Sequence, residues 1–294
     1  MAALDDFQNC PAPAKINLFL HVTGRRPDGY HLLQTAFRML DHGDTLSFER
    51  RMDGKIVRVN DIPGVPAESD LVIRAARLLR ERTGCTLGAN IRVDKRLPMG
   101  GGLGGGSSDA ASTLLALNRL WQLGCSRHEL QAWSLQLGAD VPFFIFGETA
   151  WAEGVGEQLQ PLTLPPAWYV VVEPQVSVPT LEIFRSKDLT RNTPMLIMPG
   201  FAAEQTNAYL EKTGRNDLQK VACRLYPEVQ GALDALGEFG TSGKARMSGS
   251  GACVFLPCES EPQAKRVVEA VKSEWHVWHA PSLDRHPMHA WAED

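Results

Sequence analysis

The hydrophobic and polar positions near the N-terminus alternate with the period of a β-strand. Over residues 14–22 one face carries Ile16, Leu18, Leu20 and Val22, and the other carries Lys15, Asn17, Phe19 and His21. Such alternation predicts a strand with one apolar face in the core. The second face would present Lys15 and Asn17 side by side, so this strand is a candidate for carrying chemistry.

Other strands and helices follow from periodicity and from capping signals. The further predicted strands cover residues 44–49, 55–59 and 89–93, the first two joined by a turn at Asp53-Gly54. The predicted helices cover residues 70–82, 126–138, 202–213, 217–236 and 261–275, and another is expected to start near Ala110. Gly84 ends the first helix, and Ser126 with Glu129 has the spacing of a capping box.

The spacing of prolines suggests two domains. Pro161, Pro165 and Pro166 raise the proline density after residue 160, which predicts a boundary between residues 1–160 and 161–294. Residues 276–294 mix histidine, tryptophan and proline without a period, and we expect a solvated tail. His286 and His289 alone are a weak signal for a metal site, so no protein metal ligand is assigned. The fold class is α+β, in two lobes.

Six glycines in seven positions, 100–106, are the strongest local signal. Ordering glycine costs conformational entropy, and the run leads directly into a helical pattern. A loop without β-carbons at a helix N-terminus lets backbone N–H groups approach an anion. The alternative is a glycine-rich surface turn without a ligand.

The glycine run does not match a known nucleotide loop uniquely. A dinucleotide-binding G-x-G-x-x-G pattern fits at Gly100, Gly102 and Gly105, but a run with this many glycines would match the pattern by chance. The acidic residue that this motif requires about 20 positions later is not convincingly present. A P-loop requires lysine where Ser107 stands. Phosphate charge would therefore be met by backbone amides, by the Ser107 and Ser108 hydroxyls, by a metal ion and by cations elsewhere in the chain.

Composition narrows the class of protein. The chain has 294 residues, 44% of them hydrophobic, and a formal charge of −4, which argues against a general nucleic-acid binder. No apolar stretch is long enough to cross a membrane, and we expect no membrane partner, no secretory signal and a cytoplasmic location. The six cysteines are scattered and are expected to be reduced thiols.

One carboxylate stands in an apolar run. Asp140 lies within the sequence LGADVPFFI at 137–145, where an isolated charge would be costly, so it needs a cation or a donor. Lys15, on the polar face of the first strand, is the natural partner. The pair would suit proton transfer, or alternatively would be an ion pair that ties two elements together.

Three motifs in the same order resemble those of the GHMP kinases, a family that includes galactokinase, homoserine kinase and mevalonate kinase. They are PAKINL at 13–18, PMGGGLGGGSSDAA at 98–111 and SGSGACVF at 248–255. Within the family, residues 14–20, 26–31 and 138–142 are similar to the branch that phosphorylates the 2-hydroxyl of a cytidine diphosphate-linked methylerythritol, in non-mevalonate isoprenoid biosynthesis. Other GHMP kinases of small metabolites, or a non-catalytic nucleotide-binding relative, are the alternatives.

The resemblance implies a two-lobed fold with the active site in the cleft between the lobes. It implies that Lys15 and Asp140 are the catalytic pair and that ATP, with Mg²⁺, is the co-substrate. The implied ATP-binding residues are Pro98, Met99, Gly100, Gly101, Gly102, Leu103, Gly104, Gly105, Gly106, Ser107 and Ser108. Lys95 would reach adenosine or phosphate oxygens, or would be a solvated residue at the end of a strand. Asp70 fits a helix N-terminus first and a nucleotide contact second.

The resemblance also assigns residues to the acceptor, a small molecule with a cytidine diphosphate group. Tyr30 would stack on the base and His31 would hydrogen-bond its edge, whereas on sequence alone both are ordinary packing residues. Phe184 would close the other side of the ring. Asn17 and Thr180 would donate to the substrate, with a buried polar spacer as the alternative for Asn17. We expect a monomer or a weak homodimer.

Overall fold

The computed structural model describes residues 6–198, 200, 202–240 and 243–294. The strands are β1 (Asp6–Arg25), β2 (His31–Arg51), β3 (Ile56–Arg58), β4 (Gly88–Asp94), β5 (Ala150–Glu153), β6 (Gln158–Pro161), β7 (Trp168–Glu173), β8 (Arg246–Met247), β9 (Val254–Cys258) and β10 (His276–Leu283). The α-helices are α1 (Leu71–Thr83), α2 (Gly105–Leu120), α3 (Arg127–Ser134), α4 (Val141–Phe146), α5 (Thr180–Arg185), α6 (Ala203–Thr213), α7 (Gln219–Leu225), α8 (Pro227–Gly237) and α9 (Glu261–Val271), with short 3₁₀ turns at Ala67–Ser69 and His289–Trp291.

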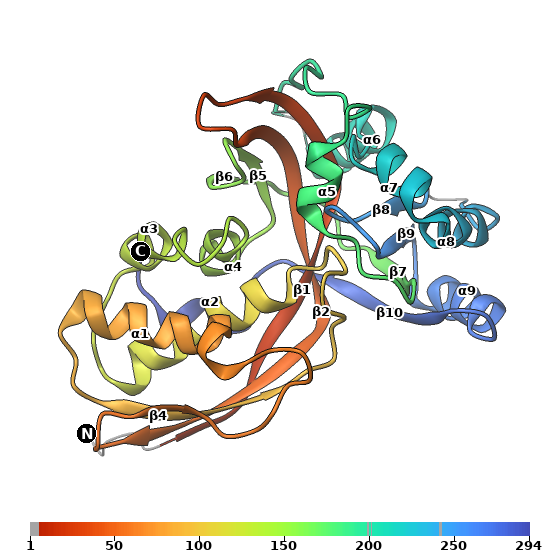
Figure 1. The fold of residues 1–294 in the computed structure, drawn as a ribbon. Coiled ribbons are helices and arrows are strands. Elements are labelled where there is room, and N and C mark those ends of the chain that lie inside the picture. Colours follow the sequence, from red (N-terminus) through yellow and green to blue (C-terminus); the bar gives the residue numbers. More distant parts are fainter. Residues whose placement is uncertain (1–5, 199, 201, 241–242) are drawn as a thin grey trace.

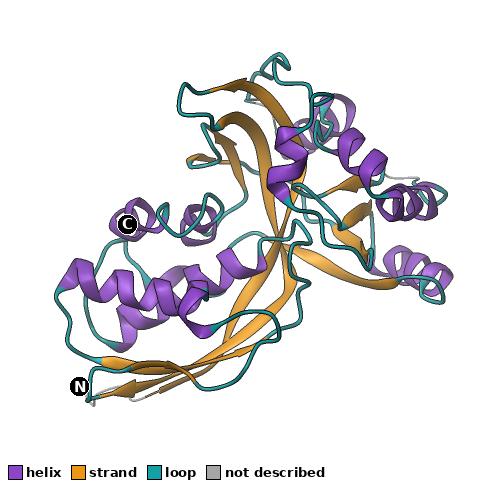
Figure 2. Cartoon of the chain, in the orientation of Figure 1, coloured by secondary structure: helices purple, strands orange, loops and turns teal. Residues whose placement is uncertain are grey.

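Two long antiparallel strands, β1 and β2, form the spine of the molecule (Figure 1). The ten described strands form one sheet with the path β3-β4-β2-β10-β7-β9-β8, and β1 and β5 also pair with β2. Helices α1–α4 lie on one side of the spine, and α5–α9 lie on the other, as the colouring by secondary structure in Figure 2 makes clear. The α+β fold with two lobes is therefore confirmed.

The strand predicted at 14–22 is part of the longer β1, and both of its faces are buried. Lys15, Asn17 and His21 are as inaccessible as their apolar neighbours. The pairing of β1 with β2 shifts register between Asn17 and Phe19, which interrupts strict alternation. The predicted apolar face is thus correct, while the polar face is enclosed by the second lobe and by the glycine run.

Capping residues set the helix ends where local chemistry is strong. The Asp70 carboxylate accepts from the Val72 amide at 3.0 Å and starts α1, which ends at Gly84 with φ +68°. The capping box of Ser126 and Glu129 is present at α3. Ser260 caps α9.

Several predicted boundaries are wrong. The helix expected at 217–236 is two helices, α7 and α8, because Pro227 has no N–H to continue the first. The helices starting at Ser126 and Ser260 end earlier, at Ser134 and Val271. Strand β3 does not pair with β2 across the Asp53-Gly54 turn, because β4 lies between them and pairs with β3 in parallel.

The segment expected as a solvated tail is structured. Residues 276–283 form β10, which pairs with β7 and β2. Beyond it, Met288 and Ala292 are buried in the core of the first lobe. The buried guanidinium of Arg127 donates to the carbonyls of Ile145, His289 and Ala292 at 2.7–2.8 Å, and so holds the C-terminal segment in place.

The core of each lobe contains residues from the other side of the boundary expected at residue 160. Leu20 and Val22 of β1 pack into the cluster formed by residues 170–271, and the C-terminal segment packs into the first lobe. The division at 160 stays a prediction, and each of the three buried clusters that the described residues form combines residues from both sides of it. None of the described helices is both long and apolar enough to cross a membrane.

His286 makes the stability of this fold depend on pH. It is buried, its Nδ1 accepts from the Met288 amide at 3.1 Å, and burial together with the charges of His289 and Arg127 lowers its pKa from 6.5 to about 3. Since a histidine with a lowered folded-state pKa stabilises the fold above its unfolded pKa, that stability is lost as pH falls below 6.5.

We therefore expect wild type to lose about 2 kcal/mol more unfolding free energy than His286→Gln between about pH 7.5 and about pH 5, measured by urea denaturation. The same substitution at the exposed His128 is the matched control. Parallel pH dependence in wild type and His286→Gln would contradict this account of the tail.

Candidate active site

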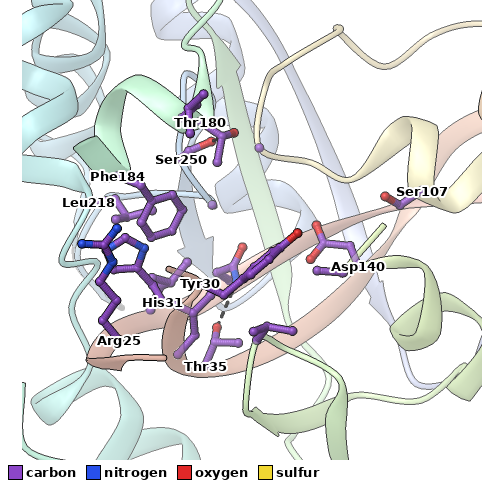
Figure 3. A pocket seen from close by; sticks show the side chains of 18 of the residues that line it. Arg25, Tyr30, His31, Thr35, Ser107, Asp140, Thr180, Phe184, Leu218 and Ser250 are labelled. Carbon is purple, nitrogen blue, oxygen red and sulfur yellow. Dashed lines mark hydrogen bonds between the residues drawn. The ribbon is translucent and has the colours of Figure 1, made fainter. Parts of the chain in front are cut away.

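Two cavities meet at the glycine run. The larger, about 960 Å³, extends from β1 and β2 to α5, and the smaller, about 360 Å³, lies between the run and the N-terminus of α1. Gly100, Gly102 and Ser107 line both cavities. Figure 3 shows the larger cavity, with Asp140 and Ser107 toward one end and His31 and Phe184 toward the other.

The glycine run forms the N-terminus of α2. The helix begins at Gly105, five residues earlier than expected, and Gly104 precedes it with φ +74°, which a side chain would disfavour. The first i→i−4 hydrogen bond runs from the Ser108 amide to the Gly104 carbonyl at 2.8 Å. The amides of Gly105, Gly106 and Ser107 therefore have no intrahelical acceptor and suit an anion.

The second lobe holds the glycine run from the opposite side. The Ser248 hydroxyl donates to the Gly102 carbonyl at 2.8 Å, and the Cys253 amide donates to the Gly101 carbonyl at 3.1 Å. A β-carbon on Gly102 would lie 2.1 Å from the Ser248 carbonyl oxygen. The motif at 248–255 thus packs directly on the predicted phosphate loop.

Lys15 and Asp140 come together as predicted from the sequence. The Lys15 ammonium is 3% exposed and lies 3.4 Å from Oδ2 of Asp140. It donates to Oδ1 of Asn17 at 2.7 Å and sits 5.3 Å from the centre of the Phe37 ring. Asn17 in turn donates to the Thr35 hydroxyl at 2.9 Å. Both charges line the larger cavity.

Asp140 remains accessible to a ligand, unlike its partner. It occupies the residue before α4 and makes no side-chain capping bond there, and its side chain is 33% exposed. One carboxylate oxygen faces Lys15, which leaves the group able to accept a proton from a hydroxyl in the cavity. The arrangement suits a general base held by a buried cation.

Lys95 is engaged by two aspartates and is not a solvated strand-end residue. Its ammonium bonds the carboxylates of Asp44 and Asp109, and Asp44 also accepts from the Leu97 amide at 2.8 Å. Burial lowers the pKa of Lys95, but the charges of Asp109 and Asp44 outweigh it and the net shift is upward. Burial raises the pKa of Asp109 to about 7, although Lys95 opposes the rise. The cluster lies beside the smaller cavity and fixes the start of the glycine run.

The predicted acceptor residues gather at the far end of the larger cavity. The rings of His31 and Phe184 stack on each other, with centroids 4.7 Å apart and planes at 26°. Tyr30 is 66% exposed, and in the view of Figure 3 it lies between that pair and Asp140. Because His31 already covers one face of Phe184, a base would not enter between these two rings. The predicted sandwich of Tyr30 and Phe184 stays a prediction.

Thr180 lies where the second lobe meets the cavity. Its hydroxyl is 2.7 Å from the Ser250 hydroxyl, which joins the first residue of α5 to the motif at 248–255. Both side chains line the larger cavity and are visible at its rim in Figure 3. Thr180 is thus able to donate to a ligand there.

Comparison with known proteins identifies the family. The model of the GHMP kinases N terminal domain matches residues 70–148, and that of the GHMP kinases C terminal domain matches residues 198–277. A 4-diphosphocytidyl-2-C-methyl-D-erythritol kinase of Aromatoleum aromaticum is 61% identical, with 99% of this chain and 98% of that protein covered. One of Ralstonia nicotianae is 59% identical, with 98% of each covered.

This chain belongs to the GHMP kinase family.

Solved structures of the family share the fold. A crystal structure of 4-(cytidine 5′-diphospho)-2C-methyl-D-erythritol kinase superposes with a TM-score of 0.78 at 36% identity and covers 94% of this chain and 98% of that one. Homoserine kinase from Cytophaga hutchinsonii superposes with a TM-score of 0.72 at 17% identity, with 97% of each chain covered, which shows the common fold alone. As a GHMP kinase, the protein uses ATP as its co-substrate.

The sequence did not reveal every residue of the kinase's cavities. Ile62 and Val65 line the smaller cavity with Asp70, which both caps α1 and bonds Arg58 at 2.6 Å. The proline- and glycine-rich stretch just before the α1 cap was a usable signal for such a loop. Arg191 lines the larger cavity from a coil segment, and no local pattern marks it.

Gly102 and Gly84 offer a matched test of the contact between the lobes. Both have positive φ, but a β-carbon meets nothing at Gly84 and strikes the Ser248 carbonyl at Gly102. We expect each alanine substitution to cost about 1–2 kcal/mol of stability from the backbone alone. Only Gly102→Ala should raise the KM for ATP, by about tenfold or more, because the loop must move. Equal ATP KM values in both variants would show that this contact does not shape the nucleotide site.

Proposed function

We propose that this GHMP kinase transfers the γ-phosphoryl group of ATP to the 2-hydroxyl of 4-diphosphocytidyl-2-C-methyl-D-erythritol. The products are the 2-phosphate and ADP, and the step belongs to non-mevalonate isoprenoid precursor biosynthesis. Relatives that are 55–61% identical over nearly their whole length carry the name of that kinase. The observation that carries the proposal is the larger cavity, which joins the Lys15–Asp140 pair beside the glycine run to the stacked rings of His31 and Phe184.

The two cavities suit the two substrates. The smaller one has the free amides of the α2 N-terminus for phosphates and the apolar side chains of Ile62 and Val65 for a base. The larger one, about 960 Å³, is large enough to hold a nucleoside diphosphate joined to a second group. An acceptor as small as homoserine would leave most of it empty. The proposed ATP contacts are residues 98–108 and Lys95.

In the proposed mechanism Asp140 acts as general base. Its carboxylate accepts the proton of the acceptor hydroxyl as the oxygen attacks the γ-phosphorus, and the bond to the β-phosphate oxygen breaks. Lys15 pairs with the Asp140 carboxylate, orients it and stabilises the charge on the transferring group. Asn17, held by Thr35, orients the Lys15 ammonium and faces the substrate.

At the far end, Tyr30, His31 and Phe184 would recognise the cytosine ring, and Thr180 would donate to the acceptor. Aromatic faces bind a planar base by stacking, and an imidazole nitrogen is able to pair with the edge of the base. The His31–Phe184 stack and the exposed Tyr30 support this assignment. A specificity site this far from Lys15 fits an acceptor with a nucleobase.

Mg²⁺ would accompany ATP. The described residues hold no group of three or more metal-ligating side chains, so the ion would take its oxygen ligands mainly from the phosphates and water. The Ser107 hydroxyl, at the junction of the cavities, is an oxygen donor that fits such a role. The expectations of a monomer or weak homodimer, of a cytoplasmic location and of no nucleic-acid partner stay predictions.

Asp140→Asn tests the catalytic pair. The amide keeps the shape of the side chain but accepts no proton, so we expect kcat to fall by about 10²–10⁴-fold while ATP affinity, measured by calorimetry, stays near wild type. The same substitution at the exposed Asp41 is the control. Turnover near wild type in Asp140→Asn would remove the general base from the mechanism.

A panel of acceptors tests the substrate. We expect ADP release with 4-diphosphocytidyl-2-C-methyl-D-erythritol and little with homoserine or mevalonate, in a coupled assay with saturating ATP. Because the chemistry at Asp140 is common to all three, the difference would report on the distant end of the cavity. Turnover with homoserine or mevalonate alone would overturn the proposed acceptor.

A further inference from the structure

Arg191 joins the two walls of the cavity's far end. Its Nη2 donates to the carbonyls of Phe184 and Ser186, both at 2.7 Å, and its Nη1 donates to the Leu189 carbonyl at 3.1 Å. Its Nε donates to Nε2 of His31 at 3.1 Å. One planar guanidinium therefore fixes the end of α5 and the start of β2 relative to each other.

The bond to His31 determines where the imidazole carries its proton. A guanidinium only donates hydrogen bonds, so Nε2 of His31 must accept. The ring is then neutral with its proton on Nδ1, and none of the described residues bonds that nitrogen. Burial and the charges of Arg191 and Arg25 lower the pKa of His31, which agrees with a neutral ring.

The bonds to the main chain steady the other wall. Helix α5 has only six residues and no side-chain cap at its N-terminus, so it has little stability of its own. Arg191 satisfies the Phe184 and Ser186 carbonyls at its C-terminal end. The Phe184 ring is thereby kept against His31, as Figure 3 shows for the two side chains.

We propose that Arg191 is a positioning residue for base recognition: it fixes His31 as the Nδ1–H tautomer and holds Phe184 beside it, so that the cavity offers a hydrogen-bond donor. That donor suits N3 of cytosine, which is an acceptor, and opposes uracil, whose N3 carries a hydrogen. The inference rests on the proposed function, and it adds a physical basis for choosing cytidine over uridine diphosphate compounds.

The tautomer is tested without substrate. In ¹⁵N-labelled wild-type protein, with His31 assigned through His31→Gln, we expect the nitrogen shifts of a neutral ring protonated at Nδ1. Arg191→Met has no donor and should give a mixture of tautomers. Arg224→Met is the matched control, since Arg224 bonds the Ser186 hydroxyl at 3.2 Å and pairs with Asp188 but bonds neither His31 nor the Phe184 carbonyl. An Nε2–H ring in wild type would overturn the inference even if the kinase turns over its acceptor.

Kinetics separate positioning from general stability. Arg191→Met should raise the acceptor KM about tenfold, leave kcat and the ATP KM within about threefold, and reduce the preference for the cytosine over the uracil form of the acceptor about tenfold. Arg191→Lys keeps the charge but not the planar set of donors, and we expect the same loss. Equal increases in the acceptor KM and the ATP KM would indicate a merely structural role and would overturn the inference.

A double-mutant cycle with His31→Ala tests the route of the effect. If Arg191 sets the base preference through His31, the preference of the double variant for the cytosine over the uracil form of the acceptor should stay within about threefold of that of His31→Ala alone, because stacking on Phe184 does not distinguish the two bases. Multiplicative effects would contradict the inference. Failure of the proposed function has a different signature: no phosphorylation of the acceptor, with the Nδ1–H tautomer of wild type intact.

Discussion

The buried ammonium of Lys15 is the constraint around which this kinase is arranged. A charge that is only 3% exposed must be paired and hydrogen-bonded, and here Asn17 and Asp140 supply the partners while the Phe37 ring lies nearby. The Lys15 amide also donates to the Leu103 carbonyl at 2.9 Å. Lys15 thus connects β1, β2, α4 and the glycine run. A movement of any of these elements would expose the Lys15 ammonium or break its pairing.

The two ends of the site differ in the groups that they present to a ligand: backbone groups at one end and side chains at the other. Around the proposed phosphate site the protein offers main chain: glycines without β-carbons, the amides of the α2 N-terminus, and the turn at Ser248 that bonds the run from the second lobe. At the far end it offers side chains held by Arg191. Backbone amides suit the phosphates common to every ATP-dependent kinase, whereas side chains allow one acceptor to be chosen over another.

Features that depend on partners nearby in the sequence could be predicted, whereas most features that depend on partners far away in the sequence could not. Asp70, Gly84 and Ser126 mark helix ends because their partners lie within four residues. The pairing of Lys15 with Asp140 was also predictable, since a carboxylate in an apolar run requires a cation. The burial of His286 could not be foreseen, because its distant partners are Ser112 of α2 and Gly147, the residue that follows α4. The role of Arg191 could not be foreseen either, because its partners in α5 and β2 lie far apart in the sequence and come together only in the fold.

The most direct test of the central claim is a crystal structure of the kinase with a non-hydrolysable ATP analogue and 4-diphosphocytidyl-2-C-methyl-D-erythritol together. We expect the triphosphate on the amides of residues 105–107, the acceptor 2-hydroxyl within hydrogen-bond distance of the Asp140 carboxylate, and the cytosine ring beside His31. A 2-hydroxyl bound away from Asp140, with the Lys15–Asp140 pair remote from both ligands, would contradict it.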